Sequence, residues 1–455
     1  MDRQNVVICG AGIAGISTAY HLAVRQGMRD ILLIDERPPL SLTSDKSTEC
    51  YRNWWPGPGD AMVSLMNRSI DLLEHLARAS GNAFHLNRRG YLYLTADKDK
   101  LHLMLEQAQE SSNLGAGPLR IYRGESDDPR YHPHDPLDFS TAPERADLIL
   151  DRNLLRRHFP YITGQAVAAF HVRRAGWFSA QQLGSLLLSQ AKENGVNLLE
   201  GRVSGVDLER GQVVSVRLES GEEIPTHHFV NAGGPYLGQV AEMFGIQLPI
   251  FNELHIKVSA NDHLNIIPRD APLLIWNDPQ KLPWTDEERQ FLAEDASSRH
   301  LLDEFPPGVH TRPEGPPDSP IFLMLWEYRT SQVDPIWPLP LDPEYPEIAL
   351  RGLTTMIPEL KKYFDKPPRP YLDGGYYTKT RENRPLIGPL LVEGAWVIGA
   401  LSGFGLMASM AAGELLALHI MKKQLPPYAP ALDLNRYQDS DYQKLLDRWE
   451  DSGQL

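Results

Sequence analysis

Cysteine is almost absent from this sequence, whose 455 residues include only Cys9 and Cys50. Because Cys9 falls inside a predicted strand, a disulfide framework is excluded and a reducing compartment is indicated. Long apolar runs are also missing: glycines and Glu414 interrupt the longest candidate, residues 401–421, whereas a membrane-spanning helix needs ~20 apolar residues. The first predicted strand begins almost at Met1 and leaves no room for a targeting peptide. We therefore expect a cytoplasmic protein without a membrane span.

Positive charge is scarce as well, since 45 Lys and Arg stand against 59 Asp and Glu and give a net charge of −14. With no basic run in the chain, nucleic acid is not an expected partner. His132 and His134 are spaced like a metal-binding pair. No cysteine or carboxylate stands near them at ligand spacing, so no metal is expected.

One stretch near the start of the chain has the order of a dinucleotide-binding unit. A strand at 6–9 runs into the glycine pattern of residues 10–15, and a helix extends through His21. A second strand, 31–34, ends on Asp35. The glycines permit a tight turn, close approach to a pyrophosphate and close helix packing, while the acid can accept ribose hydroxyls. The helix start offers free N–H groups to the phosphates.

Two further glycine turns follow predicted strands later in the chain. Residues 231–235, Asn-Ala-Gly-Gly-Pro, end one strand. Residues 402–405, Ser-Gly-Phe-Gly, separate a strand at 395–400 from a long helix at 406–421. Because the carboxyl ends of parallel strands share one edge of a sheet, these turns are expected beside the first.

The rest of the chain indicates a second sheet. Strands are expected at 91–94, 166–170, 254–260, 272–276 and 321–326, and an antiparallel meander at 203–208, 213–218 and 222–224. Further helices are expected at 62–79, 101–110, 180–194, 346–363 with a break at Pro358, and 437–450. The fold class is therefore α/β (α+β overall), a Rossmann-like domain with a second domain on a mainly antiparallel sheet.

Three segments of the chain have no regular pattern. The loop 36–60, with hydroxyls, Arg52 and two tryptophans, suits either a segment folded over a large ligand or a surface loop whose tryptophans dock on the core. Residues 111–146 and 277–320 are rich in proline and charge, and are expected to be insertions that form loops, lids or partner surfaces.

Three blocks together resemble the flavoprotein superfamily of D-amino-acid oxidase, glycine oxidase and sarcosine oxidase. They are residues 10–15 with Asp35, the turn 231–235, and residues 377–413. The third block contains Tyr-Thr-Lys-Thr, Arg-Pro-Leu-Ile-Gly and Gly-Ala-Leu-Ser-Gly-Phe-Gly-Leu, and it is most similar to the monomeric sarcosine oxidase branch. The resemblance implies FAD as cofactor and oxidation of a C–N bond.

The resemblance also implies roles for individual residues. Val203 would meet the adenine, Arg52 would bind a substrate carboxylate, and Tyr377 would lie beside the flavin ring. Arginine suits a carboxylate because its planar fork donates two parallel hydrogen bonds. The full set expected to bind the cofactor is Gly10, Gly12, Ile13, Ala14, Gly15, Asp35, Glu36, Arg37, Lys46, Ser47, Thr48, Val203, Ala232, Gly233, Arg384, Gly403, Phe404, Gly405, Leu406 and Met407.

On this basis the chain is divided into alternating segments. The FAD-binding domain is expected at 1–45, 160–248 and 370–425, the cofactor-covering loop with parts of the substrate domain at 46–159, the substrate domain at 249–369, and a tail at 426–455.

The sequence also departs from the sarcosine oxidase branch. Gly375 replaces the cysteine that bonds the flavin in that branch, so non-covalent FAD is expected, with Cys50 as a remaining candidate for a covalent link. Met407 replaces a substrate-binding lysine and Phe404 replaces a histidine. The pocket is therefore expected to take a larger, more hydrophobic amine or amino acid, held by Arg52 alone.

The electron acceptor stays open between O2 and a carrier. The segment 322–326, where related oxidases carry a lysine above the flavin, has none, and Lys257 is either a substitute or a solvated strand residue. We expect hydride transfer from a small-molecule amine or amino acid to flavin N5, followed by hydrolysis of the imine. Alternatives are a dehydrogenase with a protein or quinone acceptor, an assembly factor with structural FAD, and an NAD(P)-linked enzyme. The oligomeric state is not predicted.

Overall fold

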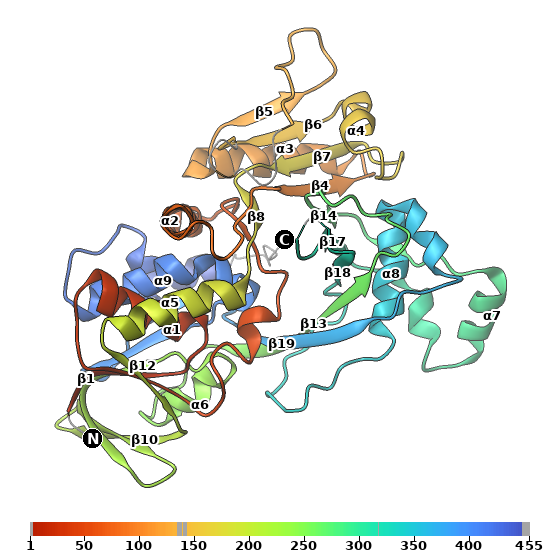
Figure 1. Ribbon diagram of the computed structural model, residues 1–455. Coiled ribbons are helices and arrows are strands. Elements are labelled where there is room, and N and C mark those ends of the chain that lie inside the picture. The colour runs from red at the N-terminus through yellow and green to blue at the C-terminus, as the bar shows by residue number, and fades with distance from the viewer. Residues whose placement is uncertain (1–2, 134–138, 140–142, 317, 448–455) are drawn as a thin grey trace.

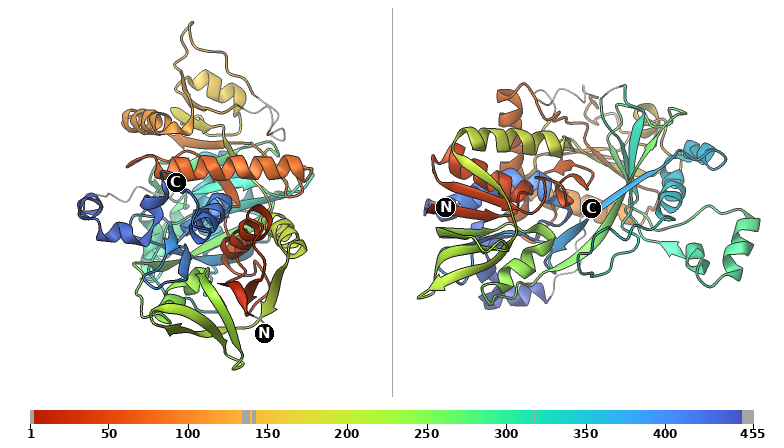
Figure 2. Two further views of the ribbon diagram at one scale, coloured as in Figure 1. Left: turned by 90° about the vertical axis from the view of Figure 1, so that its left-hand side faces the viewer. Right: turned by 60° about the horizontal axis from the view of Figure 1, so that its bottom comes forward.

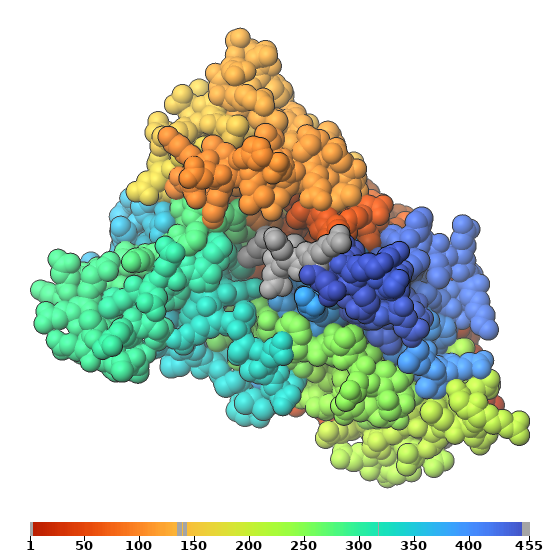
Figure 3. All heavy atoms as spheres, turned by 180° about the vertical axis from the view of Figure 1, so that it is seen from behind, coloured from red at the N-terminus to blue at the C-terminus, as the bar shows by residue number. Residues whose placement is uncertain are grey.

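Two large β-sheets organise the chain in the computed structural model, which describes residues 3–133, 139, 143–316 and 318–447. Figures 1 and 3 show a roughly triangular molecule. The first sheet occupies one corner, the end of the second sheet around β5–β7 another, and the segment around α7 the third.

The first sheet has a parallel centre. Its strands follow the order β10-β11-β12-β1-β2-β9. The second half of β12 also pairs with β21, on the side away from β1, and β20 pairs with β21. The strands are β1 (Gln4–Cys9), β2 (Ile31–Asp35), β9 (Val196–Glu200), β10 (Val203–Glu209), β11 (Gln212–Leu218), β12 (Glu223–Asn231), β20 (Leu386–Pro389) and β21 (Ala395–Gly399). Strand β12 pairs antiparallel with β11 at its start and parallel with β1 and β21 further on.

Alternate residues of the central strands enter different cores. Val6 and Ile8 of β1 pack with the helices, whereas Val7 packs with the meander β10–β11 and with α6 (Leu237–Glu242). This alternation is what a strand buried on both faces produces. Figures 1 and 2 show the helices α1 (Ile13–Tyr20), α5 (Ala180–Glu193) and α9 (Gly405–Ile420) together on one face.

Helices α1 and α9 cross at very short distance. A Cβ on Gly413 would lie 2.7 Å from the carbonyl carbon of Ser17, so only glycine fits there. The Ser17 hydroxyl donates a hydrogen bond of 2.8 Å to the carbonyl oxygen of Ser409. The first and last thirds of the chain are therefore fastened together in one layer.

The second sheet is mainly antiparallel, in the order β19-β13-β18-β17-β14-β4-β7-β6-β5. Within this second sheet, β14–β4 and β5–β6 are the parallel pairs among the described strands. The strands are β4 (Tyr91–Thr95), β5 (Leu119–Tyr122), β6 (Ala146–Ile149), β7 (Ala168–Val172), β13 (Phe251–Asn261), β14 (Leu273–Trp276), β17 (His310–Pro313), β18 (Ile321–Leu325) and β19 (Tyr371–Lys379). The α/β fold with a second, mainly antiparallel sheet is therefore confirmed.

Helices cover both faces of the second sheet. The helix α8 (Tyr345–Met356) packs with Leu92, Leu274 and other residues of one face. Residues of the opposite face, such as Tyr93 and Phe170, join the core that contains α2 (Ala61–Ala79) and the helices of the first sheet. As expected from Pro358, α8 ends and the 3-10 turn η6 (Pro358–Tyr363) takes over.

The remaining elements are short. They are η1 (His21–Arg25), η2 (Thr43–Asp45), β3 (Cys50–Arg52), α3 (Lys100–Ser111), η3 (Ser112–Ala116), α4 (Arg152–His158), β8 (Ala175–Trp177), η4 (Gly234–Tyr236), β15 (Gln280–Lys281), α7 (Asp286–Glu294), η5 (Arg299–Leu302), β16 (Glu304–Phe305), η7 (Ser402–Phe404), η8 (Ala429–Leu432), η9 (Leu434–Gln438) and α10 (Ser440–Leu446).

Several expectations about local structure are wrong. The segments 111–146 and 277–320 are not loops throughout, because β5 and β17 lie within them and pair inside the second sheet. The first helix continues past Tyr20 as the π-helical turn η1. The strand expected at 166–170 lies two residues later, as β7.

The end of the chain also differs from the expectation. The helix expected at 437–450 is the shorter α10, and residues 448–450 lie outside the described part of the chain. The domain boundaries stay a prediction.

One helix among the described residues is long and apolar enough to cross a membrane, Ser402–Ile420. Its most apolar window is 72% buried, and α9 packs against α1 and α2. This burial identifies it as a core helix.

Candidate active site

The three glycine turns meet around one groove of about 630 Å³. It lies where β1, β12 and β21 end, as the parallel sheet requires. Its lining includes Gly12, Ile13, Ala14, Thr43, Ser44, Ser47, Ala232, Gly234, Pro235, Tyr376, Tyr377, Thr378, Leu401, Ser402, Gly403, Gly405 and Leu406. The structure therefore brings together residues from both ends of the chain that the sequence predicts at a common site.

The first turn is built by glycines with different tasks. Gly10 has a φ of +113°, and a Cβ there would meet the backbone carbonyl of Ala232. A Cβ on Gly15 would meet the carbonyl of Gly10. These two glycines thus permit close backbone packing, whereas Gly12 lies on the groove itself.

Asp35 holds the first turn in place. Its Oδ2 accepts a hydrogen bond of 2.7 Å from the Ala11 amide, and its Oδ1 accepts one of 2.9 Å from the Arg37 amide. Burial raises the pKa of Asp35, and these two amides oppose that shift. The carboxylate therefore orders the turn, and its contact with a ribose stays a prediction.

Other residues expected at the adenosine end lie near Asp35. Glu36 pairs with Arg202 at 3.7 Å, and the Arg37 guanidinium lies 5.5 Å from the ring centre of Trp337. Val203 begins β10, shortly after β9, which pairs with β2 at Asp35. Their contacts with a cofactor stay predictions.

The loop over the groove is fixed by charged side chains. Lys46 Nζ donates to Asp373 at 2.8 Å, away from the groove lining. Lys257 Nζ donates to the Asp45 carbonyl and Arg312 Nε to the Thr48 carbonyl, each at 2.8 Å. The loop is thus tied to β13, β17 and β19.

Ser44 is a lining residue that the sequence analysis missed. Its hydroxyl accepts a hydrogen bond of 3.0 Å from the Ile13 amide at the start of α1. No local signal marks it, because its place depends on how the loop folds back over α1.

At the third turn the expected residues divide into lining and support. Gly403, Gly405 and Leu406 line the groove. Phe404 is buried against Trp55 with 5.1 Å between ring centres, and Met407 is buried in α9. Two further members of the expected set do not line the groove: Arg384 donates to the Pro58 carbonyl, and Gly233 donates its amide to the Asn231 side chain at 3.2 Å.

A second cavity, partly open to solvent, lies beyond Phe404, whose ring contacts its lining residue Trp55. Its lining includes Arg52, Trp54, Trp55, Tyr93, Met104, Phe170, Gly308 and Glu327. Arg52 donates from Nε to the Trp54 carbonyl at 3.3 Å and its guanidinium lies 4.5 Å from the ring centre of Trp55. The tryptophans of the covering loop are therefore walls of a cavity and buried core residues at once.

Tyr377 stands between the groove and this cavity. It lines the groove, and its ring is stacked on His255 with 3.9 Å between ring centres. His255 Nδ1 lies 2.9 Å from Glu327 Oε1, and Glu327 lines the cavity. His255 and Glu327 are further candidate residues that the sequence analysis missed.

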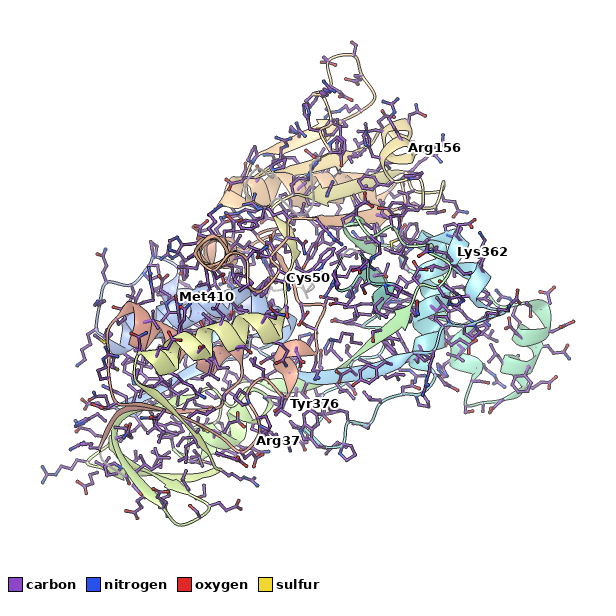
Figure 4. The ribbon with its side chains drawn as sticks, viewed as in Figure 1. Arg37, Cys50, Arg156, Lys362, Tyr376 and Met410 are labelled. Carbon is purple, nitrogen blue, oxygen red and sulfur yellow. The ribbon has the colours of Figure 1, made fainter. Side chains whose placement is uncertain are left out.

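No covalent attachment point for a flavin is accessible at the two expected positions. A Cβ on Gly375 would lie 3.1 Å from both Thr43 Cα and Lys46 Cβ, which leaves little room for a cysteine. Cys50 is buried near the middle of the molecule (Figure 4), its Sγ donates to the Thr48 carbonyl at 3.3 Å, and burial raises the pKa of its thiol. A thiol in such surroundings is a poor nucleophile.

Metal ligands are not gathered anywhere in the described ranges: no group of three or more His, Cys, Asp or Glu side chains could hold a metal ion there. His132 is described, but His134 lies outside those ranges.

The groove fits FAD on its own chemistry. The Ser402 hydroxyl is buried at the third turn, and no described residue gives it a hydrogen-bond partner. The starts of α1 and α9 both face the groove, and helix starts favour phosphate or a negative flavin edge. Its residues would hold a dinucleotide across the three turns.

Comparisons with known proteins agree with this assignment. Among solved structures, L-proline dehydrogenase from P. horikoshii has a TM-score of 0.73 at 20% identity and covers 96% of this chain and 98% of its own. Glycine oxidase from Geobacillus kaustophilus has a TM-score of 0.72 at 14% identity and covers 96% and 99%. These likenesses establish the fold.

A curated relative is mitochondrial dimethylglycine dehydrogenase of Rattus norvegicus, 23% identical over 276 residues, or 60% of this chain. The match spans 28% of that relative's length. The family profile described as DAO, FAD dependent oxidoreductase, matches residues 5–418. The FAD expected from the sequence is thereby confirmed, and the chain belongs to the DAO family of FAD-dependent oxidoreductases.

Proposed function

We propose that this protein oxidises the C–N bond of an amino acid or a secondary amine to an imine, which water then hydrolyses. The main observation behind this proposal is that the cavity lined by Arg52 lies against the third glycine turn, residues 402–405. The contact is made by Trp55 of the cavity and Phe404 of the turn. Dimethylglycine dehydrogenase, L-proline dehydrogenase and glycine oxidase, the similar proteins above, are all named for amino acids or N-methyl amino acids.

The protein supplies binding and orientation in this reaction, and bound FAD supplies the hydride acceptor, at flavin N5. Arg52 presents a guanidinium to a substrate carboxylate. Tyr377 positions the substrate beside the groove, and apolar side chains supply much of the lining of the cavity that receives it.

We further propose that the acceptor of the electrons is a carrier rather than O2. Lys257, the candidate for an oxygen-activating lysine, is engaged with the Asp45 carbonyl and lines neither the groove nor the cavity. Burial lowers the pKa of Lys257. Its role is therefore to hold the covering loop.

The test is anaerobic reduction of the bound flavin by a panel of D-, L- and N-methyl amino acids. At least one member should bleach the visible flavin absorbance within seconds to minutes. Addition of air should then restore the colour slowly, and a quinone or dye acceptor quickly. A flavin that no member of the panel reduces would contradict the proposal and favour an assembly factor with structural FAD.

A further inference from the structure

We propose that Glu327 accepts a hydrogen bond from the ammonium group of the incoming substrate, so that the cavity holds a zwitterionic amino acid by both charged ends. The ammonium group then releases one proton to solvent before the neighbouring carbon gives up a hydride. This rests on the proposed function, and it replaces the expectation that Arg52 alone holds the substrate. The inference starts from the second cavity, where Glu327 and Arg52 are both lining residues.

The Glu327 side chain is open to the cavity and to little else. It lies two residues after the end of β18, and 30% of the side chain is exposed, although its neighbour Trp326 is buried. The Oε1 atom lies 2.9 Å from His255 Nδ1. None of the described residues donates a hydrogen bond to Oε2. A carboxylate oxygen that lines a cavity without a donor is suited to an N–H group of a ligand.

The surroundings keep this carboxyl group ionised. Burial works to raise the pKa of Glu327, but His255 outweighs it and lowers the pKa to about 2, with further help from Lys379 and His310. Tyr345 and Tyr377 face the same carboxylate as neutral phenols, since burial raises the pKa of both. An ionised acceptor in a mostly apolar cavity favours a cation as its partner.

His255 fixes the direction of Glu327. Its Nε2 lies 3.2 Å from Glu253 Oε2, and Glu253 accepts a hydrogen bond of 2.9 Å from Lys379. The charges therefore alternate along Lys379, Glu253, His255 and Glu327. Because His255 is also stacked on Tyr377, which lines the groove, Glu327 is connected to the groove through these two rings.

The other walls indicate the size of the substrate. Trp54, Tyr93, Met104 and Phe170 line the same cavity as the two charged groups. Trp54 and Phe170 contact each other with 4.4 Å between ring centres. Such walls favour a substrate with a large apolar side chain over glycine or its N-methyl derivatives.

The test compares two probes of the same shape in the FAD-bound protein: phenylalanine, which carries both charges, and 3-phenylpropionate, which lacks the ammonium group. Binding is measured anaerobically from the change in the visible flavin spectrum. Glu327→Gln should raise the dissociation constant of phenylalanine at least about 30-fold and change that of 3-phenylpropionate less than two-fold. Glu327→Asp, which keeps the charge, should recover part of the affinity for phenylalanine.

Glu253→Gln is the matched comparison, because it removes a carboxylate from the other side of His255, outside the cavity lining. It should bind phenylalanine at least about ten-fold more tightly than Glu327→Gln does. Equal weakening of both probes in Glu327→Gln, or no weakening of either, would overturn the inference. If no amino acid reduces the wild-type flavin, the proposed reaction fails, while the difference between the two probes still decides the role of Glu327.

Discussion

The imidazole ring of His255 is stacked on the phenol ring of Tyr377, with 3.9 Å between ring centres and 16° between ring planes. Both residues are buried, and they come from the adjacent strands β13 and β19. Since Tyr377 lines the FAD groove and His255 contacts Glu327 of the cavity, this pair links the groove with the cavity.

Removal of the Tyr377 ring should destabilise the protein, because it leaves a hole beside His255. We expect Tyr377→Ala to lower the free energy of unfolding by about 3–5 kcal/mol. Tyr377→Phe keeps the ring and should lose less than about 1 kcal/mol. Urea unfolding of the FAD-bound protein measures both, and equal losses would show that the stack contributes nothing.

The ion pair of His255 and Glu327 should make stability depend on pH at both ends. The pKa of Glu327 is lowered from 4.5 to about 2, so its contribution is complete above pH 4.5 and is lost as the pH falls towards 2. Burial alone would lower the pKa of His255, but its two carboxylates raise it above 6.5. Its contribution is therefore complete below pH 6.5 and is lost as the pH rises through the raised value.

Urea unfolding at a series of pH values checks this dependence. The wild-type protein should lose stability more steeply below pH 4.5 than Glu327→Gln does. If the free energy of unfolding falls equally steeply below pH 4.5 in the two proteins, the assignment is wrong.

Gly10→Ala should abolish FAD binding. The new methyl group would meet the Ala232 carbonyl at a φ of +113°, and the two effects together should cost about 2–4 kcal/mol of stability. Gly27→Ala is the matched control, since Gly27 has a φ of +73° with nothing within 4 Å of its added Cβ. The ratio of visible to ultraviolet absorbance after purification gives the FAD content. A yellow Gly10→Ala protein would refute the packing argument.

Gly375→Cys should not create a covalent flavin. The side chain would press on Thr43 and Lys46, so the covering loop has to shift and FAD content should fall. Acid precipitation separates the two outcomes, because free FAD stays in the supernatant. A yellow pellet would show that the loop can make room for the bond.

Arg52→Lys keeps a positive charge and loses the planar fork. We expect the dissociation constant of a carboxylate ligand such as 3-phenylpropionate to rise at least about 30-fold. An amine without a carboxylate, such as phenethylamine, should bind almost as before. Unchanged binding of 3-phenylpropionate, titrated by flavin absorbance, would remove Arg52 from the site.

The nucleotide-binding half of the site is readable from sequence because each turn is encoded locally. A strand, a few glycines and a helix start lie within about ten residues in each case, and backbone sterics leave few alternatives at such turns. The three turns also predict the position of the groove, since one residue of each turn (Gly12, Ala232 and Gly403) lines it.

The second sheet is harder to predict because part of it is polar. Strand β17 reads His-Thr-Arg-Pro, without the apolar alternation of a strand. Arg312 is nevertheless fully buried, paired with Glu314 and close to Glu49. Burial also raises the pKa of Glu49 to about 7. These partners are distant in sequence or come from loops, so no local pattern could reveal the strand.

Glu327 and His255 escaped prediction for a related reason. Each is an ionisable residue in or shortly after a strand, and most such residues point to solvent. Only the register of β13 with β18, in which Lys257 lies opposite Leu325, brings them together.

The hydrogen bond from Ser17 to Ser409 spans 392 residues of chain. During synthesis, the first glycine turn therefore leaves the ribosome almost 400 residues before the helix α9 that completes its surroundings. We therefore expect the nascent chain to hold no FAD until α9 has been made, because the apolar face of α1 that packs on α9 stays uncovered until then. Capture of the flavin is then a late event that seals the molecule rather than a seed for its folding.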